Sequence, residues 1–152
     1  MREIDKQLHD AAWGNDYEAI KVLIRAGANL EAQDQPGETA LHETAIHDHT
    51  EAMEALIRAG ADLDAQDGFG RTALFIAVYR RNTATMEMLI QAGADLNAEL
   101  SREWLNIPIG STPRDVAAQE GDTHIVAMID EALAARAIQE KSGPGKRHRS
   151  TL

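Results

Sequence analysis

The chain has 152 residues, and its hydrophobic content of 43% is sufficient for one folded domain. It contains no cysteine, which excludes disulfides, zinc–thiolate sites and thiol catalysis, and only six aromatic residues are available to its core. The formal net charge is −10, and because residues 141–152 hold four Lys and Arg and no acid, residues 1–140 carry −14. Such an acidic body should repel nucleic acid phosphates; it either serves solubility or attracts a basic partner.

No targeting or membrane segment is recognisable. The chain opens with charges in Met1-Arg-Glu-Ile-Asp, and no apolar run of signal-peptide length follows. No run approaches the roughly 20 apolar residues that a membrane span needs. We therefore expect a soluble cytoplasmic protein that does not bind a membrane.

A phrase recurs along the chain at a fixed interval. Gly27, Gly60 and Gly93 are 33 residues apart, in Arg-Ala-Gly-Ala-Asn-Leu, Arg-Ala-Gly-Ala-Asp-Leu and Gln-Ala-Gly-Ala-Asp-Leu. A second phrase, Gly37-Glu-Thr-Ala-Leu-His, returns after 33 residues as Gly-Arg-Thr-Ala-Leu-Phe and after a further 40 as Gly-Ser-Thr-Pro-Arg-Asp. A period of this length predicts a stacked solenoid with a binding surface.

Helix starts and ends recur within the same period. Side chains that can cap a helix precede apolar residues spaced for one helical face, so helices are predicted after Asp16, Thr39, His49 or Thr50, Thr72, Asn82, Thr112 and Asp122. Pro113 follows Thr112 directly, as at the first position of a helix. The three repeated glycines fit the left-handed position that ends the second helix of each pair. Since a helix pair of this kind cannot bury its apolar face alone, the pairs are expected to stack.

These phrases resemble the ankyrin repeat, which reads Gly-x-Thr-Pro-Leu-His-x-Ala at its first helix and Gly-Ala-Asp-x-Asn before a β-hairpin. The resemblance implies an all-α solenoid, a stack of helix–turn–helix pairs joined by β-hairpin loops, in a single domain over residues 1–140. Its four repeats are expected at about residues 5–34, 37–67, 70–99 and 110–140. Residues 141–152 are expected to form a basic disordered tail, either merely solvated or a targeting or docking signal.

The two end repeats have the features of caps. In the first, Lys6-Gln-Leu-His stands where Thr-Pro-Leu-His would be. In the fourth, Arg114 replaces the leucine expected to be buried at positions 8, 41 and 74, and the apolar residues from Ile125 onward suggest one long closing helix. A polar residue at this position suits a face that has no further repeat to cover it.

An insertion of seven residues separates the third and fourth repeats, over residues 100–109. Gly60 and Gly70 are 10 residues apart, whereas Gly93 and Gly110 are 17 apart. The inserted stretch is too apolar for an idle solvent loop. Either Trp104 and Ile107 fold back over the repeat junction as a small satellite core, or they are presented to a partner.

Motifs for catalysis and for metal binding are incomplete. In His42-Glu-Thr-Ala-Ile-His47 the histidines are five residues apart, whereas the zinc protease motif needs four so that both reach one metal ion. The resemblance gives His42 a different role, as the histidine that hydrogen-bonds near the helix cap. No phosphate loop, nucleophile elbow or Ser-His-Asp set is present. We therefore expect no enzymatic activity and no cofactor; the alternative is a metal- or small-molecule-dependent function that uses His42, His47 and His49 or a pocket under the insertion.

The expected binding surface is the concave groove with the loop tips. In the family this groove and these tips contact partners, and three large apolar side chains recur there in register, namely Trp13, Ile46 and Tyr79. Residues of the same surface with the chemistry of interface anchors are His47, Phe69, Arg71, Arg80 and Trp104. The competing interpretation is that Trp13 and Tyr79 only cover the helix pairs behind them. We expect a protein partner, with a monomer in solution and self-association through the apolar row as the alternative.

Overall fold

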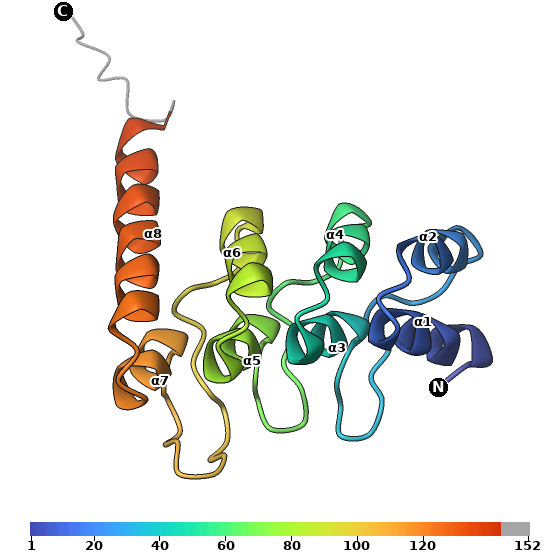
Figure 1. Cartoon of the computed structure of the whole chain (residues 1–152), viewed down its shortest axis with the longest axis horizontal. Helices are drawn as coiled ribbons and strands as arrows, with labels where there is room; N and C mark the ends of the chain where they lie inside the picture. The colour runs from blue at the N-terminus through green and yellow to red at the C-terminus, as the bar shows by residue number, and fades with distance from the viewer. Residues whose placement is uncertain (144–152) are drawn as a thin grey trace, which may run out of the picture.

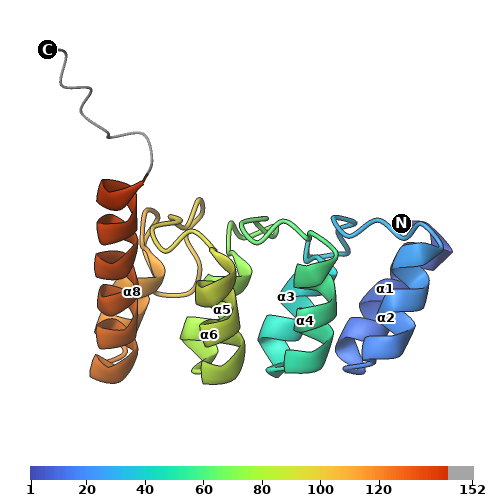
Figure 2. The ribbon, with the colours of Figure 1, turned by 90° about the horizontal axis from the view of Figure 1, so that it is seen from above.

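In the computed structural model, residues 1–143 are described, and they form eight α-helices in pairs (Figure 1). The helices are α1 (Glu3–Trp13), α2 (Tyr17–Arg25), α3 (Ala40–His47), α4 (Thr50–Arg58), α5 (Ala73–Arg80), α6 (Thr83–Ala92), α7 (Pro113–Gln119) and α8 (Thr123–Ser142). The pairs stand in a row, with the odd-numbered helices in one layer and the even-numbered helices in the other (Figures 1 and 2). The expected all-α solenoid is confirmed.

The core is a line of contacts between repeats. Leu8, Leu41 and Leu74, at equivalent positions of α1, α3 and α5, are buried, as are Leu56 and Leu89 in the other layer. At the equivalent position of α7, the guanidinium of Arg114 is partly exposed and donates to both carboxylate oxygens of Asp130 on α8, at 2.6 and 2.9 Å. A charged residue fits here because no further repeat covers this face.

Helix starts combine local caps with caps supplied by the preceding repeat. Asp16 and Asp122 accept a hydrogen bond from the N–H three residues on, as an N-cap does. His49 and Asn82, the N-cap residues of α4 and α6, make no such bond. The preceding repeat supplies the acceptor instead. Asn15 accepts the N–H of Ala52 at 2.9 Å, and Asp48 accepts the N–H of Thr85 at 3.1 Å. The first and second repeats thus each cap a helix of the next repeat.

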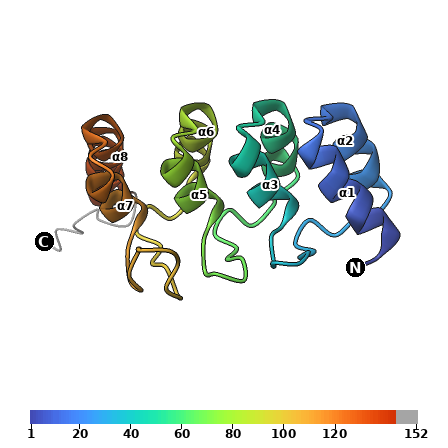
Figure 3. The same ribbon diagram turned by 60° about the horizontal axis from the view of Figure 1, so that its bottom comes forward.

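The three loops between helix pairs project on the same side of the stack (Figure 3). They close as turns, in which Asp34 N–H donates to Glu38 O and Asp67 N–H to Arg71 O. The β-hairpins implied by the resemblance are not formed as strands within residues 1–143, where the one bridge joins Trp104 and Ile107. Neighbouring loops contact each other instead, since Gly68 N–H donates to Pro36 O at 2.9 Å.

Helix α8 is longer than the other helices and includes the first residues of the expected tail. Arg136 of α8 donates to the carbonyl of Ile90 in α6, at 2.8 Å, and to that of Ala94 just after α6, at 2.7 Å, and these bonds anchor α8 against the third repeat. Lys141 and Ser142, which the sequence assigned to the basic tail, belong to α8. The rest of that prediction concerns residues 144–152, which lie outside the described part.

Across residues 1–143, no helix combines the length and the apolar character needed to cross a bilayer.

The start of α1 depends on Asp5. This carboxylate is almost fully buried, accepts the Arg2 guanidinium at 2.8 and 2.9 Å, and accepts the N–H of Asn29 at 2.7 Å. These bonds hold the pKa of Asp5 below its usual range, and the bond from Arg2 has the largest effect. A charged group therefore ties the first helix to the segment that follows its partner helix.

Asp5→Asn is expected to lower the free energy of unfolding at pH 7, and the difference from wild type should shrink with acidification. A carboxyl whose folded pKa is lowered stabilises the fold above its unfolded pKa of about 3.9, and this contribution is lost as the pH falls through the folded value. Urea unfolding between pH 7 and pH 2 measures it. Asp10→Asn, an exposed carboxylate on the same helix, is the control. A deficit of the same size at every pH would contradict the charge argument.

Candidate functional site

The predicted row of Trp13, Ile46 and Tyr79 lies near the ends of α1, α3 and α5, which contact one another in order (Figure 1). Exposure is uneven along it. Trp13 is 63% exposed, whereas Ile46 is half-buried against the main core and Tyr79 is half-buried against Trp104. The predicted row of three apolar side chains is therefore open to solvent at Trp13 and covered at Tyr79, towards the insertion.

Two imidazole rings lie in series beside Trp13. The Trp13 ring meets His47 edge-on, with centroids 6.2 Å apart and planes at 84°, and His47 stacks on His49 at 5.5 Å and 28°. His49 Nδ1–H donates to the carbonyl of Ala12 at 3.2 Å, which fixes the second imidazole against α1. We call these three residues the Trp13–His47–His49 row. The sequence predicted Trp13 and His47 for the binding surface, whereas it named His49 only as a possible helix start and as part of the alternative histidine group.

The insertion folds back onto the third and fourth repeats. Phe75, Leu100, Ile107 and Val116 form a second buried cluster, on which Trp104 and Tyr79 pack. The Trp104 ring lies 4.6 Å from that of Tyr79 and 6.1 Å from that of Phe75. Of the two interpretations of the insertion, the satellite core describes the structure. A surface hollow of about 600 Å³ lies at the insertion, where the sequence allowed a pocket, and it is lined by Glu103, Asn106, Pro108 and Ile109.

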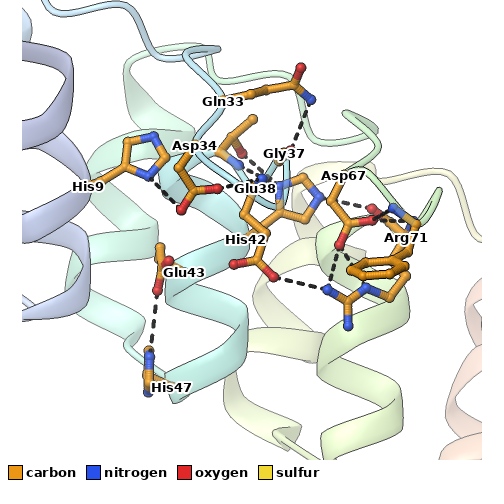
Figure 4. Close-up of polar contacts among 12 residues, drawn as sticks. His9, Gln33, Asp34, Gly37, Glu38, His42, Glu43, His47, Asp67 and Arg71 are labelled. Carbon is orange, nitrogen blue, oxygen red and sulfur yellow. Dashed lines mark hydrogen bonds and ion pairs between the residues drawn. The ribbon is translucent and has the colours of Figure 1, made fainter. Parts of the chain in front are cut away.

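Arg71 lies against Trp104 of this cluster and pairs with two carboxylates, one of which comes from the preceding repeat (Figure 4). Its guanidinium lies over the rings of Phe69 and Trp104, 5.1 and 4.7 Å from their centroids, and pairs with Glu38 at 2.9 Å and Asp67 at 2.6 Å. Only 12% of the Arg71 side chain is exposed. Burial raises the pKa of Glu38, although Arg71 opposes this effect. Arg71 thus joins two repeats, whereas Arg80, at the end of α5, is exposed to solvent.

The suggested histidine group of His42, His47 and His49 is not a site. His42 is buried between helices, where its Nδ1 accepts the N–H of Thr39 at 3.0 Å and its Nε2–H donates to the carbonyl of Arg71 at 2.9 Å. Burial lowers the pKa of His42, which keeps the ring neutral in this role. Because both of its nitrogens are engaged, His42 cannot share a metal ion with His47 and His49; its expected capping role is confirmed.

A different polar cluster lies beside the Trp13–His47–His49 row. His9 of α1, Asp34 of the following loop and Glu43 of α3 bring one nitrogen and two carboxylate oxygens within 4.8 Å of one another (Figure 4). Burial, followed by the charge of Asp34, raises the pKa of Glu43. These residues line a surface hollow of about 430 Å³ together with Trp13 and Asp10. This cluster was not predicted from the sequence. A signal for it was present, because Lys6 stands in the first repeat at the position that Thr39 has in the second.

Two comparisons with known proteins bear on identity. No curated protein matches the chain. A family model of ankyrin repeats matches residues 8–99 in three copies, a range that runs from within α1 to beyond the end of α6. Because this match covers more than half of the sequence, the chain belongs to the ankyrin repeat family.

Proposed function

We propose that this chain is a non-enzymatic interaction module that binds a partner protein through the Trp13–His47–His49 row and the adjoining loop side of the stack. Ankyrin repeats generally mediate protein–protein interaction, and proteins built from them are typically not enzymes. The observation that carries the proposal is the exposure of Trp13, at 63% in a protein with two tryptophans. Tryptophan is among the commonest anchors of protein interfaces because it buries a large rigid surface.

The geometry around Trp13 suits an anchor. His47 holds the indole edge-on, so its orientation is restricted before a partner arrives, which lowers the entropy lost on binding. Phe69, 39% exposed at a loop tip, and the exposed Arg80 extend the surface towards the third repeat. Ile46 is half-buried against the main core, whereas Tyr79, Trp104 and Arg71 pack together in the satellite core.

The charge of the surface favours a basic partner segment. Asp10 lines the same hollow as Trp13, Asp48 lies between His47 and His49 in sequence, and both carboxylates are exposed. Residues 1–140 carry a formal charge of −14. Complementary charge chiefly speeds association and selects partners, and added salt screens it. We therefore expect the affinity for the partner to fall as ionic strength rises.

The test compares Trp13→Ala with Ile138→Ala, which removes a side chain of similar exposure, 65%, from the remote helix α8. Proteins retained by the immobilised wild-type chain are identified, and their affinities are then measured with each purified variant. We expect Trp13→Ala to weaken binding of the partner by about 2 kcal/mol or more, roughly 30-fold in affinity. Ile138→Ala should bind the partner with unchanged affinity. Both should lower folding stability by less than about 1 kcal/mol.

Two results would contradict the proposal. One is a partner that binds Trp13→Ala as tightly as wild type. The other is a concentration-dependent dimer in light scattering that dissociates in Trp13→Ala, because the row would then bind a second copy of the chain. We expect a monomer across the concentration series.

A further inference from the structure

His9 has a nitrogen without a partner, and comparison with His42 explains why. The two histidines occupy equivalent positions of α1 and α3, and each donates from Nε2–H to a backbone carbonyl, His9 to that of Ala32 at 2.8 Å. In His42, Nδ1 then accepts the N–H of Thr39. Helix α1 begins earlier in its repeat than α3 does. Lys6, at the position equivalent to Thr39, therefore lies inside the helix, and its N–H donates to Arg2 O.

The Nδ1 atom of His9 therefore keeps a free lone pair in a buried place. His9 is 7% exposed, and its Nδ1 is buried and has no hydrogen-bond partner among residues 1–143. The nearest carboxylate oxygen, Asp34 Oδ2, is 4.0 Å away, too far for a hydrogen bond. Leaving a buried acceptor unsatisfied is unfavourable, so such an atom calls for an explanation in a ligand or a function.

Two carboxylates surround this nitrogen. Asp34 uses Oδ1 to accept the N–H of Glu38 at 2.8 Å, which leaves Oδ2 facing His9. Glu43 is half-buried on α3, and its Oε2 lies 3.6 Å from Nε2 of His47. One imidazole nitrogen and two carboxylate oxygens from three separate segments thus converge within 4.8 Å, with a second imidazole at their edge.

We propose that His9 Nδ1, Asp34 and Glu43 bind a divalent transition-metal ion with the preferences of Zn²⁺. Imidazole and carboxylate are ligands that Zn²⁺ accepts, whereas Ca²⁺ and Mg²⁺ prefer oxygen alone. The other nitrogen of His9 donates to a backbone carbonyl, the arrangement that fixes the tautomer of histidine ligands in metal sites. His47, at the exposed edge, is in place to supply a fourth ligand.

The geometry requires only a small contraction. Metal–ligand distances of about 2.0–2.1 Å place tetrahedral ligand atoms roughly 3.4 Å apart. The present separations are at most 4.8 Å, a difference that side-chain rotation in Asp34 and Glu43 covers. The hollow lined by Trp13 and Asp10 gives a path for the ion from solvent.

A bound ion would join the first repeat to the second. Its ligands come from α1, from the loop after α2 and from α3, so the folded chain offers a set of ligands that the unfolded chain does not. We expect the ion to raise the unfolding temperature, and by more as its free concentration rises above the dissociation constant. The metal site does not depend on the proposed protein partner, although His47 belongs both to its ligands and to the Trp13–His47–His49 row.

The experiment titrates Zn²⁺ by calorimetry into the untagged full chain after treatment with a chelator, and repeats the titration with Asp34→Asn and Glu43→Gln. Asp34→Asn is well suited because the amide oxygen can still accept the N–H of Glu38 while its NH₂ donates to the free nitrogen of His9. Without metal this variant should be as stable as wild type. His124→Gln and His148→Gln, which remove imidazoles far along the chain, serve as controls.

We expect one equivalent of Zn²⁺ to bind wild type and both histidine controls, with at least tenfold weaker binding in Asp34→Asn and in Glu43→Gln. The Nδ1 signal of His9 in a ¹⁵N spectrum should move on addition of one equivalent. Saturable binding unchanged in both carboxylate variants would overturn the assignment, as would a His9 signal that stays in place. No saturable binding to wild type would also overturn it.

Discussion

Arg71→Ala is expected to lower the free energy of unfolding by about 3–5 kcal/mol, the loss seen when one partner of a buried ion pair is removed. The carboxylates of Asp67 and Glu38 are 0% and 11% exposed, and Arg71 is the cation that pairs with both. Its loss also removes the cation lying over the Phe69 and Trp104 rings. Chemical denaturation at neutral pH measures the effect.

Two further variants separate charge from shape. Arg71→Lys keeps the cation but not the planar fork that reaches both carboxylates, so we expect a smaller loss than for alanine. Arg80→Ala removes an exposed arginine nine residues on and should change stability by less than about 0.5 kcal/mol. If Arg71→Ala behaves like Arg80→Ala, the ion pairs do not stabilise the contact between the second and third repeats.

Gly70→Ala is expected to be far more damaging than the matched change Gly60→Ala. Both glycines have a left-handed backbone, with φ of 82° and 90°, so alanine at either position is disfavoured by about 1–2 kcal/mol. At Gly60 an added Cβ meets no described atom within 4 Å, whereas at Gly70 it would lie 2.7 Å from the backbone nitrogen of Ser101 and closer still to its hydroxyl. This overlap should add about 1–3 kcal/mol.

The reason is a contact between loops that stack side by side. Gly70 lies against the start of the insertion, so relief of the overlap would displace Leu100, which is buried in the satellite core. Thermal unfolding of the two variants measures the difference, and near-ultraviolet circular dichroism reports the packing around Trp104. Equal losses at the two glycines would show that the loops separate easily and do not support the satellite core.

The sequence could predict much of the fold because its signals are local. Thr72 and Thr112 accept bonds from the first turns of α5 and α7, and Asp16 and Asp122 do so for α2 and α8, each within three residues of the cap. Gly27, Gly60 and Gly93 all have the left-handed φ expected of them. The period then placed Leu41 and Leu74 in the core and Arg114 on the last face. Each prediction needs only a few neighbouring residues and the repeat length.

The candidate site could be predicted only in part. Trp13 and His47 share one surface, as the repeat alignment suggested, but Tyr79, Arg71 and Trp104 form a packed cluster. The sequence left two arrangements of the insertion open because an apolar side chain such as Trp104 suits a core and an interface equally. Only the contact of its ring with Tyr79 and with the Arg71 guanidinium distinguishes them.

The period, the helix pairs, the buried leucines and the two capping repeats could all be predicted from the sequence, because they depend on short phrases and on the interval at which these phrases recur. Contacts between repeats are seen only in the tertiary structure. They are the capping of α4 by Asn15, the burial of Arg71 beside Glu38, and the contact of His9 with Asp34 and Glu43. These residues are 25 to 37 positions apart, and they come into contact only when one helix pair stacks on the next.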